Sequence, residues 1–213
     1  MDYSPGLRGV IAGETQISTV GMEGTSLRYR GYDAVGLTNT NTYEDVASLI
    51  IDDDLDGELF KKSFSNHYKK LSENSELIEL INRLKTEQHP MDVTRTAISY
   101  IGEANESNKL DAASKVTAIA CLAIASYNKE LSDVLDQKYT VASSLLPNSS
   151  TQQQLEALDD MLILYAEHGF NASTFAARVT ASTRSDLISA IVSGVGTLKG
   201  ELHGGANEAA VEL

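Results

Sequence analysis

The sequence feature that most constrains this fold is a nearly apolar, alanine-rich run. Its core, Val116-Thr-Ala-Ile-Ala-Cys-Leu-Ala-Ile-Ala125, lies between polar flanks at Asp111 and Asn128. A helix that is apolar on all sides needs neighbours that bury most of its surface, so we predict a central helix over residues 111–128. Cys121 is then expected to be a buried small hydrophobic residue rather than a reactive thiol. The run is too short to span a bilayer.

The sequence after Thr40 shows helical spacing of its apolar residues in most places. Residues 6–32 are instead rich in Gly, Thr, Ser and Val, and a turn at 21–24 predicts a short antiparallel hairpin there. We therefore expect an all-α fold, mainly a helical bundle with an amino-terminal β-hairpin, in a single domain over residues 1–213. Further helices are expected over residues 43–51, 77–84, 90–101, 131–143, from about 152 onward, 173–183 and 185–198.

The composition narrows the choice of partners. Thirty Asp and Glu residues stand against 17 Lys and Arg, which gives a formal net charge of -13. Nucleic acids and anionic membranes are held by clustered cations, so we expect neither as a partner. The first residues lack the basic and apolar regions of a signal peptide, and we expect a cytoplasmic protein. The four histidines have no His or Cys neighbours at metal-ligand spacing, so no metal is expected.

Two segments centred on histidines carry the functional information. They are Leu162-Ile-Leu-Tyr-Ala-Glu-His-Gly-Phe-Asn-Ala-Ser-Thr-Phe-Ala-Ala-Arg178 and Lys199-Gly-Glu-Leu-His-Gly-Gly-Ala-Asn-Glu-Ala209. Three earlier motifs accompany them in order: Gly6-Leu-Arg-Gly-Val-Ile-Ala-Gly13, Leu27-Arg-Tyr-Arg-Gly-Tyr-Asp33 and His89-Pro-Met-Asp-Val-Thr-Arg95. By these motifs the chain resembles the citrate synthase family, and Asp92 is more like the 2-methylcitrate synthase branch.

The resemblance implies the family's large helical domain and its reaction. That reaction condenses an acyl-CoA, acetyl-CoA or propionyl-CoA, with oxaloacetate to give citrate or 2-methylcitrate plus CoA. Oxaloacetate and acyl-CoA are then the expected ligands, and no metal or redox cofactor is implied. The family's large domain also forms a homodimer, and the small-residue helices over 173–198 are the expected interface.

His203 is the expected catalytic residue. A helix ends at Lys199-Gly200 and another can start after Gly204-Gly205, so the imidazole is predicted at a helix amino terminus, where the dipole favours its neutral, hydrogen-bond-donating form. The alternative from the residues alone is a histidine that fills a turn. The resemblance assigns His203 to activation of the acyl-CoA thioester during deprotonation, supported by a loop of Gly204, Gly205 and Asn207.

The two glycines of this loop are expected to let a substrate approach the backbone. Glu201 departs from the family, which usually has proline there. We expect its carboxylate, two residues from His203, to favour the protonated imidazole.

His168 is the expected substrate-binding residue. It is predicted at the end of an amphipathic helix, and the resemblance implies contact with oxaloacetate. The alternative is a histidine that complements a helix carboxyl terminus. Gly169 departs from the family, which usually has glutamate. Several other polar residues are expected to be structural: Asn171, Ser173 and Thr174 as helix caps, His89 at a helix start, His67 on a solvated face, and Arg178 and Arg184 without a catalytic role.

The resemblance also implies groups that these residues do not provide. A second histidine, the general-base aspartate, the dicarboxylate-binding arginines and the small domain would fall beyond Leu213. We therefore expect the amino-terminal, large-domain portion of a synthase. The alternatives are a non-catalytic truncated paralogue that acts as a dimerising scaffold and one half of a split enzyme.

Overall fold

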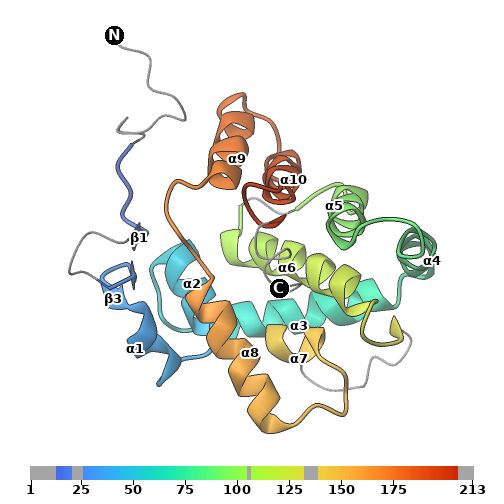
Figure 1. Ribbon diagram of the computed structural model, residues 1–213, viewed down its shortest axis with the longest axis horizontal. Coiled ribbons are helices and arrows are strands. Elements are labelled where there is room, and N and C mark those ends of the chain that lie inside the picture. The colour runs from blue at the N-terminus through green and yellow to red at the C-terminus, as the bar shows by residue number, and fades with distance from the viewer. Residues whose placement is uncertain (1–12, 21–25, 105–106, 132–138, 206–213) are drawn as a thin grey trace.

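Helices make up most of the described part of the chain, which comprises residues 13–20, 26–104, 107–131 and 139–205 of a computed structural model (Figure 1). Three two-residue strands precede the helices: β1 (Ser18–Thr19), β2 (Arg28–Tyr29) and β3 (Tyr32–Asp33). The helices are α1 (Ala34–Thr38), α2 (Tyr43–Asp52), α3 (Glu58–Ser72), α4 (Ser75–Leu84), α5 (Pro90–Tyr100), α6 (Lys109–Ala125), α7 (Val141–Leu145), α8 (Gln152–Leu164), α9 (Ala172–Ser182) and α10 (Leu187–Leu198). No helix among these residues combines the length and apolarity needed to cross a membrane.

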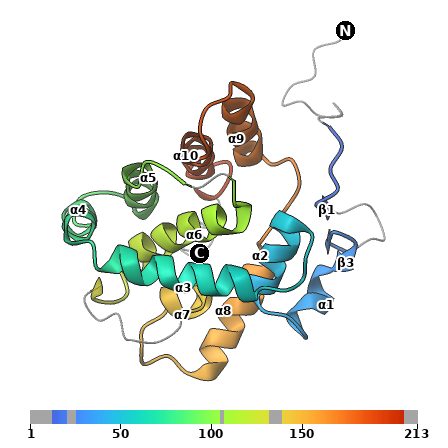
Figure 2. The ribbon, with the colours of Figure 1, turned by 180° about the vertical axis from the view of Figure 1, so that it is seen from behind.

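Helix α6 is the central element, as predicted. It lies in the middle of both ribbon views, with α3 alongside it and α5 and α7 against it (Figures 1 and 2). Val116 and Ala118 are buried on nearly opposite sides of the helix, and Cys121 and Leu122 are buried with them. Burial raises the pKa of the Cys121 thiol to about 12, so the thiol is un-ionised at neutral pH.

Helix α3 packs along α6 but was not among the predicted helices. Phe60, Phe64 and Tyr68 recur every fourth residue and are almost completely buried, which places one apolar stripe of α3 in the core. Most of the helix expected over 131–143 lies outside the described residues, at 132–138; Tyr139 and Thr140 are not helical, and α7 begins at Val141. A capping box formed by Thr140 and Ser143 fixes that start.

The amino-terminal sheet is antiparallel, in the order β1-β2-β3. The predicted hairpin corresponds to the pairing of β1 with β2, whose connecting turn lies outside the described residues. The third strand was not expected. It follows a two-residue turn in which Arg30 (φ 49°) and Gly31 (φ 91°) both have positive φ, the combination that suits a tight hairpin. The buried Tyr29 hydroxyl then donates to the Ile163 carbonyl at 2.8 Å and ties the sheet to α8.

Helices α9 and α10 pack side by side, and α10 also contacts α5. Lys199, directly after α10, places its Nζ 2.5 Å from Oδ2 of Asp92 in the first turn of α5. The Lys199 ammonium holds the pKa of the Asp92 carboxyl below its usual value. This ion pair fixes the end of α10, where the chain turns toward His203.

Candidate active site

Two chain segments meet at His203. One is the first turn of α9, and the other is the turn that follows α10. The half-buried His203 ring places Nε2 3.0 Å from Oγ of Ser173, thirty residues earlier in the chain. The Ser173 hydroxyl in turn lies 2.7 Å from Oδ1 of Asn171. The structure therefore brings the predicted catalytic histidine onto the amino terminus of α9, through a contact that no local pattern had indicated.

The start of α9 explains why Ser173 is held in place. Asn171 is the N-cap, and its side chain accepts a hydrogen bond from the Thr174 amide at 2.9 Å. Asn171 is thus confirmed as a cap, whereas Ser173, also expected only as a cap residue, bonds to the histidine as well. The cap fixes the Asn171 oxygen, and this oxygen fixes the Ser173 hydroxyl.

Ser173 can set which His203 nitrogen carries a proton. A hydroxyl has one proton, and Ser173 donates it to Oδ1 of Asn171, an oxygen that can only accept. Ser173 therefore accepts from Nε2–H of His203, and a neutral ring keeps Nδ1 unprotonated. Donation from Nδ1 requires two changes: the Ser173 hydroxyl turns from Asn171 to Nε2, and the ring proton moves to Nδ1.

The turn over residues 199–205 is closely wound. The Gly204 amide donates to the Leu198 carbonyl at 2.9 Å, and a Cβ at Gly204 would meet that carbonyl oxygen at 2.5 Å. Gly204 is therefore required by a close approach of the chain to itself, and the approach of a substrate stays a prediction. Gly205 donates to the Gly200 carbonyl, and Asn207 lies outside the described residues.

Glu201 is exposed, and within the described residues it makes no ion pair with His203. No direct contact therefore supports the prediction that the Glu201 carboxylate favours the protonated imidazole of His203.

His168 is exposed on the connection between α8 and α9. Its predicted place at a helix end was wrong, because α8 already ends at Leu164 and the chain turns at Tyr165. Gly169 has φ +71°, where a side chain would be strained, so a glutamate at this position does not suit the backbone. The Glu167 carboxylate instead accepts from the Gly169 amide at 2.8 Å.

Three further polar residues make contacts that hold the fold together. Arg178 stacks over the Phe170 ring at 5.1 Å, and His89 is the N-cap of α5, as expected. The prediction of a solvated face for His67 was wrong. Its Nε2 lies 2.9 Å from Oδ1 of Asp111 and joins α3 to α6. The described residues hold no group of His, Cys, Asp or Glu side chains arranged for a metal ion.

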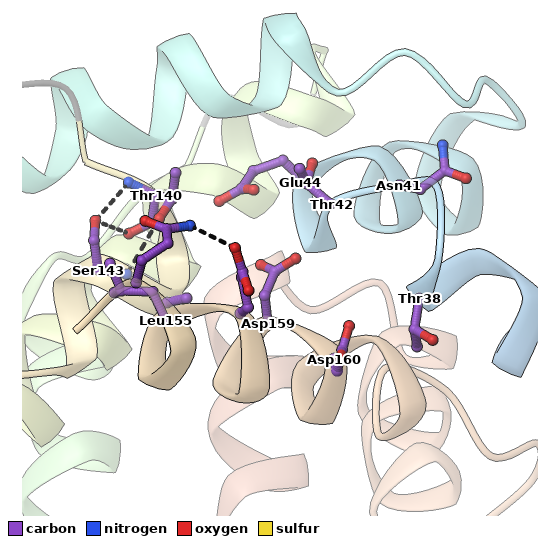
Figure 3. A pocket seen from close by; sticks show the side chains of 12 residues that line it. Thr38, Asn41, Thr42, Glu44, Thr140, Ser143, Leu155, Asp159 and Asp160 are labelled. Carbon is purple, nitrogen blue, oxygen red and sulfur yellow. Dashed lines mark hydrogen bonds between the residues drawn. The ribbon is translucent and has the colours of Figure 1, made fainter. Parts of the chain in front are cut away.

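Apart from His203, a hollow of about 530 Å³ lies between α2, α7 and α8 (Figure 3). It is lined by acidic and hydroxyl side chains, among them Glu44, Thr140, Glu156, Asp159 and Asp160. None of the histidines predicted as functional lines it, and no sequence motif had pointed to it.

Comparison with known proteins finds relatives that match almost the whole of this chain. A family model described as the citrate synthase C-terminal domain matches residues 6–213. The 2-methylcitrate synthase of Shewanella oneidensis is 38% identical over 224 residues, which are 98% of this chain and 59% of that protein. The citrate/2-methylcitrate synthase of Bacillus subtilis is 34% identical over 99% of this chain and 61% of that protein. This chain thus spans about 60% of the length of these relatives.

Solved structures show the same fold. The citrate synthase of Thermotoga maritima superposes with a TM-score of 0.79 at 30% identity, over 96% of this chain and 58% of that one. The Thermoplasma acidophilum citrate synthase, solved with carboxymethyl coenzyme A and oxaloacetate, gives a TM-score of 0.83 over 99% of this chain and 60% of that one. At 24% identity the second comparison concerns the fold alone.

Proposed function

This chain belongs to the citrate synthase family, and from that membership we propose that it is the large-domain portion of a synthase that condenses an acyl-CoA with oxaloacetate. The observation that carries the proposal is the bond between His203 Nε2 and Ser173 Oγ. It holds the imidazole at a fixed place and leaves the other ring nitrogen for a substrate.

In this proposal His203 donates a hydrogen bond to the thioester oxygen of the acyl-CoA. A base removes a proton from the carbon next to the thioester, and negative charge moves to that oxygen, where the hydrogen bond stabilises it. The enolate carbon then bonds to the ketone carbon of oxaloacetate, and water cleaves the resulting thioester to release CoA. Donation from Nδ1 of the neutral ring requires the Ser173 hydroxyl to turn from Asn171 to Nε2 and the ring proton to move to Nδ1. We assign no base to a residue of this chain.

His168 is the proposed oxaloacetate contact. Its exposure on the α8–α9 connection, which leads through Asn171 to Ser173 in the first turn of α9, supports this role. A dicarboxylate could reach the ring from solvent. Gly204 and Gly205 shape the turn that carries His203, and Asn207 is proposed to support the same loop.

Propionyl-CoA is the proposed acyl donor. The Shewanella oneidensis relative is named a 2-methylcitrate synthase, and Asp92 resembles that branch of the family. The ratio of kcat/KM for propionyl-CoA to that for acetyl-CoA tests the preference, and a ratio below one would reverse it.

Binding and turnover together test the proposed function. With four histidines, the imidazole C–H signals can be followed individually by NMR. We expect oxaloacetate to shift the signals of His168 and His203 and leave that of His67, which bonds to Asp111, unchanged. Turnover is then measured as thiol release from acyl-CoA, with the chain alone and with the part of the Shewanella oneidensis relative that this chain does not cover.

The outcomes separate the alternatives. Turnover by the chain alone supports catalysis by one chain, and turnover only after mixing supports a split enzyme. In both cases the turnover should be lost in His203→Asn and kept in His67→Gln. Oxaloacetate binding without turnover, in a mixture in which the two parts are seen to associate, indicates a non-catalytic paralogue. The absence of both binding and turnover would remove the proposal.

A further inference from the structure

The acidic hollow between α2, α7 and α8 has the properties of a binding site. In Figure 3, Glu44 reaches from α2 and Asp159 from α8 into the same space, with Thr140 at the start of α7 beside them. Four carboxylates line the hollow, those of Glu44, Glu156, Asp159 and Asp160, and its described lining contains no Lys, Arg or His.

Glu44 is the observation that points to a ligand. Its side chain is only 1% exposed, and Oε1 accepts a hydrogen bond from the Val141 amide at 2.7 Å. Oε2 is buried and has no hydrogen-bond partner. A buried carboxylate oxygen without a donor is costly, because its hydration is lost and nothing replaces it. The missing partner is therefore a hydrogen-bond donor that enters the hollow.

Asp159 is a second carboxylate in the hollow that can accept a hydrogen bond from a ligand. Its Oδ2 accepts from the Tyr43 amide at 3.1 Å, and no basic side chain of the described chain bonds to it. Burial, together with the nearby charges of Glu44, Asp160 and Asp45, raises the pKa of the Asp159 carboxyl to about 6. Two backbone amides partly offset these negative charges: that of Tyr43, at the start of α2, donates to Asp159, and that of Val141, at the start of α7, donates to Glu44.

We propose that this hollow binds the guanidinium group of a small organic cation. A guanidinium offers several N–H donors in one plane and can bond to two carboxylates at once, whereas an ammonium group is a point charge. Glu44 Oε2 and the free lone pairs of Asp159 supply the acceptors, and Thr140 and Ser143 line the rest. A bare metal ion fits less well, because the volume is about 530 Å³ and the described side chains form no metal-binding group.

Calorimetric titration of the whole chain with 1-butylguanidinium tests the proposal. The buffer is held at pH 7.5 and low ionic strength, so that Asp159 is ionised and screening is weak. Butylurea, a planar neutral analogue, is the ligand control. We expect the guanidinium to bind and butylurea not to bind. In Asp159→Asn the dissociation constant should rise about tenfold or more, as expected when one charge-assisted bond is lost.

The matched protein control is Glu79→Gln, an exposed carboxylate on α4 away from the hollow. It should leave the affinity unchanged. Circular dichroism checks that each variant is folded, and Asp160→Asn replaces Asp159→Asn if the latter loses helical signal. Equal binding of butylguanidinium and butylurea would overturn the proposal, as would unchanged affinity in the lining variant or no binding to the wild-type chain.

A third ligand identifies the source of the guanidinium. Acetyl-Gly-Arg-Gly-amide presents the same group on a peptide. Tighter binding of the peptide than of butylguanidinium would assign the site to an arginine of a polypeptide and overturn the small-molecule assignment. Weaker binding would support it. The proposed synthase function does not enter this experiment, so either proposal can fail without the other.

Discussion

The charged groups that act on Asp159, which are Glu44, Asp160 and Asp45, are all negative. Its pKa of about 6 lies above the ordinary value of 3.8, so the folded chain holds this proton more tightly than the unfolded chain does. The resulting stabilisation is fully present below about pH 4 and is lost as pH rises through about 6. At neutral pH the ionised carboxylate therefore destabilises the fold.

Asp159→Asn should stabilise the protein at pH 7.5 and have little effect at pH 4. Two pKa units correspond to about 3 kcal/mol, which partial solvent exposure reduces to roughly 1–2 kcal/mol. Urea unfolding of the variant and the wild type at both pH values measures the difference. Glu79→Gln shows how much comes from net charge alone. An equal gain at both pH values would contradict the assignment to Asp159.

Ser173 should matter for turnover more than for substrate affinity. Removing its hydroxyl frees the His203 ring to rotate and removes the group that sets its tautomer. In a preparation with synthase activity, we expect Ser173→Ala to lower kcat about tenfold, or about 1.4 kcal/mol, with a small change in KM. Ser173→Thr keeps the hydroxyl and should recover most of the rate. A rise in KM alone would mean that Ser173 contacts substrate instead.

The sequence indicated His203 as a candidate catalytic residue, but it did not indicate the contact between His203 and Ser173. The chain turn after α10 was visible in Lys199-Gly200 and in the Gly204-Gly205 pair. Ser173 belongs to a different helix, and its contact depends on the packing of α9 against α10, which the local pattern does not specify. Glu44 was missed for a similar reason, since a glutamate in the first turn of a helix is usually exposed.

Gly57 precedes α3 and lies against the start of α2. A Cβ there would meet the Asp45 amide nitrogen and the Glu44 carbonyl carbon, both at 2.5 Å. These are backbone atoms, so they cannot move aside as a side-chain end can. We expect Gly57→Ala to cost about 1–3 kcal/mol of unfolding free energy. Thermal unfolding measures this, and Gly36→Ala, where a Cβ has ordinary contacts at 3.6 Å, is the control.

Helices were predicted where one apolar pattern dominated their sequence. Helices α2, α5, α6 and α10 begin and end within a few residues of expectation. Helix α3 was missed because lysines and polar residues outnumber its buried aromatic rings, although Phe60, Phe64 and Tyr68 keep a spacing of four. Not every large apolar side chain near α8 is buried: Met161 (57% exposed) and Tyr165, directly after the helix (73% exposed), face solvent.

The exposed surface of α9 is the best candidate for a contact between two copies of the chain. None of its residues is buried, although Phe175, Val179 and four alanines between Ala172 and Ala181 are apolar. Val179 is 63% exposed. Small residues allow close packing of two helices, and we propose a homodimer formed through this face.

A substitution on α9 tests the homodimer. We expect Val179→Asp to convert dimers to monomers in analytical ultracentrifugation, weakening the dimer by about tenfold or more, because a charge would be buried at a helix contact. Leu59→Asp, which changes an equally exposed residue on α3, should leave the dimer intact. A monomeric wild-type protein at micromolar concentration would rule the proposal out.

The bond from the Tyr29 hydroxyl to the Ile163 carbonyl spans 134 residues of chain. A ribosome that adds about 5–20 residues per second needs roughly 7 to 27 seconds to make that length. During this time the amino-terminal strands exist without the helix to which they will be anchored. The strand edges are then open to other chains, so chaperone protection during synthesis should matter most for this small sheet.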